Sequence, residues 1–170
     1  VALDTSSSAT EGTDYGAVSD ITISAGATTG TTTFTPTDDS IYDASSNETA
    51  TIAINGVSGK SGVAEHGTPQ TVTITITDNE SAPTVTLSRS ASAIDEDSGS
   101  TVTITATLSV ATFQDVSVSI DGTGGTGTEG TDFGTVSDIT ISAGATTGTA
   151  AVDPTDDSVY EGNETAIIAI

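Results

Sequence analysis

The sequence predicts an all-β fold made of antiparallel β-sandwiches in tandem. Three observations lead to this prediction: an internal repeat about one sandwich long, short runs that alternate apolar residues with threonine, and clusters of Gly, Ser, Asn and Asp between those runs. No segment shows a convincing helical period, so we expect strands and turns throughout.

The internal repeat covers most of the chain. EGTDYGAVSDITISAGATTGT, which begins at Glu11, matches EGTDFGTVSDITISAGATTGT, which begins at Glu129. The repeat unit, measured from Glu11 to Glu129, is about one domain long. Such a unit is too long for a short-period solenoid and fits one β-sandwich. Val1 aligns inside a unit, with Val118, so we expect the chain to be a window of a longer array. We expect residues 1–80 to be the C-terminal part of one repeat, and residues 81–170 to be most of the next without its closing strand.

Period-two alternation predicts the individual strands. Residues 71–77 (TVTITIT) place Val72, Ile74 and Ile76 on one face and threonines on the other. The second unit opens with PTVTLS and continues with strands at 101–108, 115–120, 138–141 and 165–170. We expect roughly seven strands in each sandwich. The threonines suit an exposed strand face. An ice-binding array would need a flat sheet, whereas sandwich sheets twist.

The charge of the chain limits its partners. There are 24 Asp and Glu against 2 Lys and Arg, which gives a formal net charge of -22. Nucleic acids and anionic membranes require clustered basic residues, so we expect neither as a partner. No apolar run approaches the roughly 20 residues of a membrane span, and the first residues do not read as a signal peptide. The lack of cysteine excludes disulfides and thiolate metal sites, and leaves oxygen-seeking cations.

Acidic residues gather ahead of two matching runs, DDSIYDASSNETATIAI at 38–54 and DDSVYEGNETAIIAI at 156–170. Turns collect Asp for ordinary reasons, but these clusters are denser than turns require. Two partly buried like charges about 4 Å apart repel by about 4 kcal/mol at an effective dielectric constant of 20. Ca²⁺, which takes roughly 6–8 oxygen ligands, would offset that repulsion. Solvated acidic turns without an ion remain the alternative.

The combined signature of GTD[YF], an Ala-Gly turn, DDS[IV]Y and a closing TDNE resembles the Calx-beta repeat over essentially the whole chain. The resemblance implies tandem Ig-like antiparallel β-sandwiches that hold Ca²⁺ in loops at one end. In the second unit it implies the ligands Glu96, Asp132, Asp156, Asp157 and Glu161, with Glu164 as a further candidate. In the first unit and its closing cluster it implies Asp14, Asp38, Asp39, Asp43, Asp78 and Glu80, with Glu48 as a further candidate. Asn79 lowers the charge of the closing cluster.

From these features we expect a calcium-stabilised extracellular or cell-surface segment, such as an adhesin stalk or fibre. Ions at loop tips and at the junction between repeats would stiffen the array. Its partners would be neighbouring repeats of the same chain and other copies in a fibre. A regulatory calcium sensor and a self-assembling filament subunit are the alternatives. We expect no enzymatic activity, because paired carboxylates alone do not make a glycosidase and aromatic residues for stacking on sugars are scarce.

Overall fold

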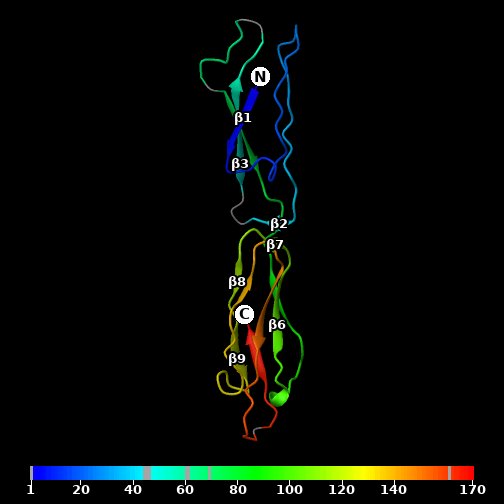
Figure 1. The fold of residues 1–170 in the computed structure, drawn as a ribbon, viewed down its shortest axis with the longest axis vertical. Coiled ribbons are helices and arrows are strands. Elements are labelled where there is room, and N and C mark those ends of the chain that lie inside the picture. The colour runs from blue at the N-terminus through cyan, green and yellow to red at the C-terminus, as the bar shows by residue number, and fades with distance from the viewer. Residues whose placement is uncertain (1, 44–46, 60–61, 69, 161) are drawn as a thin grey trace. The chain divides into compact units, whose positions relative to one another are not determined.

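The structure is a computed structural model, shown in Figure 1, and it describes residues 2–43, 47–59, 62–68, 70–160 and 162–170. The chain splits into two compact units. The first comprises Val1–Asp39 and Ser45–Asn79, and the second comprises Ser40–Ala44 and Glu80–Ile170. The regular elements are strands, apart from one short 3-10 helix, η1 (Glu96–Ser98). The predicted all-β class is therefore confirmed.

The first unit contains one three-stranded antiparallel sheet in the order β1-β3-β4. Its strands are β1 (Ala2–Ser7), β3 (Glu48–Gly56) and β4 (Thr71–Ile76). β4 falls within the predicted strand at 71–77. It pairs with β3 from Glu48↔Ile76 to Ala53↔Thr71. The hydroxyls of Thr51 and Thr73 lie 3.1 Å apart, so the threonine face links the two strands.

Tyr15 is the centre of the small core of the first unit. Its side chain is 1% exposed, and its ring lies 4.8 Å from the ring of Phe34, centroid to centroid. Ala9 and Ala50 are buried beside it. The backbone N–H of Gly16 donates to the carbonyl of Thr35 at 2.9 Å, which closes the long loop that carries Phe34 back to Tyr15.

The second unit contains a three-stranded antiparallel sheet and three two-stranded pairs. The sheet has the order β11-β6-β5, from β5 (Val85–Arg89), β6 (Val102–Leu108) and β11 (Thr147–Val152). Two antiparallel pairs are β8 (Val116–Val118) with β10 (Ile139–Ile141), and β9 (Asp121–Gly125) with β12 (Ala166–Ala169). A short parallel pair joins β2 (Ile41–Tyr42) to β7 (Ala111–Thr112).

The core of the second unit lies between these sheets. Ile104, Ala106 and Leu108 of β6 are buried, while the threonines that alternate with them face the other side, as the sequence predicts. Opposite β6, Ile139 and Ile141 of β10 are fully buried, and Phe133 joins them from a turn. The predicted strands at 101–108, 115–120, 138–141 and 165–170 are all present and shorter than predicted; β8 has half the predicted length.

β9 and β11 have no predicted counterpart, because DGTGG and TGTAAV lack β-branched alternation. In β11, a Cβ on Gly148 would lie 2.5 Å from the carbonyl oxygen of Thr140 and 2.7 Å from Cγ2 of Ile139. Gly148 therefore lets β11 approach β10 closely. A Cβ on Gly30, its counterpart in the first unit, would likewise overlap the carbonyl oxygen of Thr22.

One β-bulge distinguishes the second copy of the repeat from the first. The second copy has one residue more between Asp121 and Glu129 than the first has between Asp4 and Glu11. Gly124 and Gly125 have φ values of 92° and 93°, and the pairing of β9 with β12 shifts register between Ala166 and Ile168. These glycines adopt the left-handed conformation that the extra residue requires.

Candidate metal centre

Both units fold the GTD motif into the same turn. The N–H of Gly12 donates to the carbonyl of Tyr15 at 2.8 Å, and the N–H of Gly130 donates to that of Phe133 at 2.7 Å. Within the turn, Oδ2 of Asp14 accepts from the N–H of Thr10, and Oδ2 of Asp132 accepts from that of Thr128, each at 2.6 Å. The motif aspartate therefore holds the turn and directs the aromatic ring into the core. A carboxylate offers about four acceptor sites, so this bond leaves capacity for a cation.

Replacing Asp132 by alanine is expected to lower the free energy of unfolding of the second unit by about 1–2 kcal/mol, because the Thr128 N–H loses a charged acceptor. Asp132→Asn keeps a carbonyl oxygen in the same place and should cost less than half as much. Urea unfolding followed by circular dichroism, in the presence of chelator, measures both. Equal losses in the two variants would show that the turn depends on charge rather than on this hydrogen bond.

The GTD turn lies directly beside the DDS segment in both units. The N–H of Thr37 donates to the carbonyl of Asp14, and the N–H of Thr155 donates to that of Asp132, each at 2.9 Å. The acidic pairs, Asp38 with Asp39 and Asp156 with Asp157, follow immediately in the chain. Asp157 also stabilises its own loop, because its Oδ1 accepts from the N–H of Val159 at 2.6 Å.

In the first unit the closing TDN segment reaches the same place. Nδ2 of Asn79 donates to Oδ1 of Asp38 at 3.1 Å, across 41 positions of sequence. Thr77 donates to Oδ1 of Asn47 at 3.5 Å, at the start of β3. Three separate loops therefore meet at one end of this unit, and Asn79 bonds directly to a predicted ligand.

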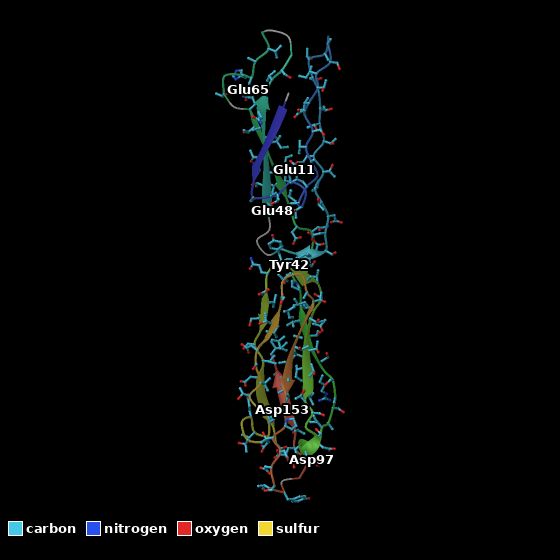
Figure 2. All side chains as sticks on the ribbon, viewed as in Figure 1. Glu11, Tyr42, Glu48, Glu65, Asp97 and Asp153 are labelled. Carbon is cyan, nitrogen blue, oxygen red and sulfur yellow. The ribbon has the colours of Figure 1, made fainter. Side chains whose placement is uncertain are left out.

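In the second unit the acidic side chains surround an open hollow of about 1510 Å³. Its apolar lining residues include Leu87, Ile104, Phe133 and Ile168. Its lining also includes Asp97, which Figure 2 labels on η1, and four of the predicted ligands. The acidic lining residues are Asp95, Glu96, Asp97, Asp132, Asp156, Asp157 and Glu164. Among the described lining residues, Arg89 is the one basic side chain.

The predicted ligands that lie among the described residues divide into three sets. Glu96, Asp132, Asp156 and Asp157 line one hollow, whereas Asp14, Asp38, Asp39 and Asp78 belong to the first unit. Asp43 and Glu80 belong to the second unit but do not line its hollow. Glu161 lies outside the described residues. Asp95 and Asp97 were not predicted as ligands, although they flank Glu96 in the acidic run IDEDSG at 94–99.

The candidate ligands of the hollow are all carboxylates, and their oxygen atoms suit a hard cation. Within the described part of the chain, no three acidic or histidine side chains already have an arrangement that could hold a metal. The four predicted ligands come from three loops: η1, the GTD turn and the DDS segment. Ca²⁺ accepts irregular geometry and completes its shell with backbone carbonyls and water, so it fits such a set better than Mg²⁺ or Zn²⁺.

Comparison with protein families gives two matches to this chain. The Calx-beta domain model matches residues 1–80 and 78–170. Comparison with curated proteins and with solved structures finds no match. Among the described residues, no helix is long and apolar enough to cross a membrane.

Proposed function

Because the chain belongs to the Calx-beta domain family and carries two of its domains, we propose that it is a calcium-stabilised segment of an extracellular stalk or fibre, as in an adhesin. The two matches confirm the resemblance read from the sequence. Calx-beta domains are non-catalytic β-sandwiches associated with calcium and occur in extracellular or surface-exposed regions. A structural role suits two units with nearly the same sequence, since repetition extends a segment without adding a new site.

The observation that supports this proposal most is the acidic hollow of the second unit. Four predicted ligands, Glu96, Asp132, Asp156 and Asp157, line it together with three further acids, against one arginine. Their mutual repulsion favours the open, separated arrangement of the loops. A divalent cation would reverse this effect, because its charge attracts all of the carboxylates to one point.

In this proposal each residue has a distinct role. Asp132 reaches the ion from a turn that it also holds in place, so its position changes little on binding. Asp156 and Asp157 bring the DDS segment, and Glu96 brings η1. Bound Ca²⁺ supplies the positive charge that joins the three loops. The joined loops then resist local opening, which is the property that a stalk requires.

Removing calcium is expected to lower the stability of the second unit by about 1–2 kcal/mol at 1 mM Ca²⁺, if the affinity is about 10⁻⁴ M as in many extracellular modules. For a domain of this size that corresponds to a fall in Tm of roughly 4–16 °C. The measurement is thermal unfolding of the whole chain in calcium and in chelator. Hydrogen exchange of the β6 and β10 amides would assign the shift to the second unit.

Two variants make this experiment specific. Asp156→Asn/Asp157→Asn should abolish the calcium shift in the β6 and β10 amides. Asp121→Asn/Asp153→Asn removes the same charge from positions that do not line the hollow, and should leave the shift in place. A calcium shift that survives the first pair and disappears with the second would refute this site. A large change of shape at micromolar calcium would instead assign the regulatory sensor role.

A further inference from the structure

Arg89 belongs to a chain with only 2 Lys and Arg residues, and it projects towards the acidic hollow of the second unit. Along β5, Val85 and Leu87 pack against the core, whereas Thr86 and Ser88 are exposed. Side chains alternate between the two faces of a strand, so Arg89 leaves β5 on the same face as Leu87. Both of these residues line the hollow. Arg89 is therefore an inward-pointing charge at the end of an apolar strand face.

The backbone fixes where the side chain of Arg89 begins. Arg89 is the last residue of β5 and pairs with Ile104 of β6, which also lines the hollow. Directly after it, the N–H of Ser90 donates to the carbonyl of Thr103 at 2.9 Å, and the N–H of Thr103 donates to Oγ of Ser90 at 2.9 Å. Arg89 is exposed, so its long side chain can adjust to the charge in the hollow while its Cα stays in place.

The charge around Arg89 is strongly unbalanced. Among the described residues that line the hollow, seven are acidic and Arg89 alone is basic. A positive charge in such a place attracts the carboxylates and repels a cation that enters. The same side chain therefore acts in opposite directions on the calcium-free and the calcium-bound unit.

We propose that Arg89 is a built-in counter-charge, which stabilises the calcium-free second unit and lowers the affinity of its hollow for Ca²⁺. This inference rests on the proposed function, because it concerns the same site. Arginine keeps its proton at any physiological pH, so the counter-charge is always present. Its effect on an ion elsewhere in the hollow should weaken in salt, because the Debye length falls from about 10 Å at 0.1 M to about 3 Å at 1 M.

The test is a calcium titration of the whole chain, followed by hydrogen exchange of the β6 and β10 amides. Arg89→Gln should bind Ca²⁺ roughly threefold to tenfold more tightly than the parent at low salt, and the two affinities should converge at 1 M salt. In chelator, the same variant should raise the unfolding equilibrium constant of the second unit by a similar factor. Arg89→Lys keeps the charge and should stay within about twofold of the parent in both measurements. The β3 and β4 amides, in the first unit, should keep their calcium dependence.

A second variant separates the position of the charge from the net charge of the chain. Thr86→Arg/Arg89→Gln moves the charge to an exposed position of β5 that is not among the described lining residues, and keeps the formal net charge at -22. It should bind Ca²⁺ about as tightly as Arg89→Gln alone. An affinity equal to that of the parent would overturn the proposal, because the total charge of the chain would then account for the effect.

The remaining outcomes distinguish this inference from the proposed function. An Arg89→Gln variant that binds Ca²⁺ no more tightly than a calcium-binding parent would overturn the role of Arg89 alone. The same holds if Arg89→Lys behaves as Arg89→Gln does, since shape rather than charge would then matter. If Arg89 only guards the edge strand β5 against pairing with another chain, Arg89→Gln should promote association at unchanged calcium affinity. A parent without any calcium dependence would refute the proposed function, and this inference with it.

Discussion

Replacing Phe133 by alanine is expected to lower the free energy of unfolding of the second unit by about 3–5 kcal/mol, the usual cost of removing a buried aromatic ring. Phe133 is 5% exposed and belongs to the same cluster as Ile139 and Ile141. Its ring also packs against β9, since a Cβ on Gly122 would lie 3.2 Å from Cε2 of Phe133. Domains of this size have total stabilities of about 5–15 kcal/mol, so the loss is a large fraction of the whole.

Phe113 provides the control for this experiment within the same unit. It is 67% exposed, so Phe113→Ala should change the stability by less than about 0.5 kcal/mol. Urea unfolding with linear extrapolation measures both variants. If the two substitutions had similar effects, the turn that carries Phe133 would not direct it into a packed core.

Gly148→Ala is expected to destabilise the second unit by about 2–3 kcal/mol through overpacking. The added methyl group would meet the Thr140 carbonyl oxygen at 2.5 Å, and side-chain carbons of Ile139 and Ile141 at 2.7 and 3.0 Å. Both isoleucines are fully buried, so neither can move into solvent. The backbone must therefore shift, which loosens the contact between β10 and β11.

Gly134→Ala is the matched control, because the nearest atom to its added Cβ is the Asp153 carbonyl oxygen at 3.8 Å. Neither glycine has a positive φ, so the comparison isolates steric overlap from backbone strain. Thermal unfolding should show a clear fall in Tm for Gly148→Ala and little change for Gly134→Ala. A Gly148→Ala variant as stable as the parent would mean that β11 does not approach β10 this closely.

The strands that were predicted best are those in which apolar residues alternate with threonine. β6 alternates Val102, Ile104, Ala106 and Leu108 with threonine, so its buried face could be named before its partners were known. β9 and β11 contain glycine where the backbone bends or approaches another strand, and glycine gives no alternation to read. The fold class therefore follows from the strong strands, while the weak strands depend on their neighbours.

One segment that occurs twice with the same sequence shows that neighbouring strands decide whether it forms a strand. ITISAGATTGT occurs at 21–31 and again at 139–149. In the second unit it forms β10 and begins β11, where β8 and β6 supply pairing partners. In the first unit no described strand pairs with it, and it is assigned no strand. A strand requires partners for its backbone groups, which no local sequence pattern can supply.

The candidate site was predictable in its chemistry but not in its geometry. Charge indicated a cation and the Calx-beta resemblance indicated which acids would bind it; of these, Glu96, Asp132, Asp156 and Asp157 line the hollow of the second unit. The second role of Asp132, as acceptor for the Thr128 N–H, required knowledge of the turn. The bond from Asn79 to Asp38 joins positions 41 residues apart, so only the folded chain reveals it.

The glycine bulge in β9 has a consequence for how two nearly identical repeats fold beside each other on one chain. On both sides of the bulge β9 pairs with β12 as β1 pairs with β3; for example, Asp121 lies opposite Ala169 as Asp4 lies opposite Ala53. Without the bulge, the additional residue would displace the ladder by one position and turn every following side chain to the opposite face of the sheet. Strand exchange between the copies is a characteristic misfolding route of repeat proteins. Because the bulge restores the register that both copies share, β9 could pair with β3, and β1 with β12, without a penalty from the additional residue.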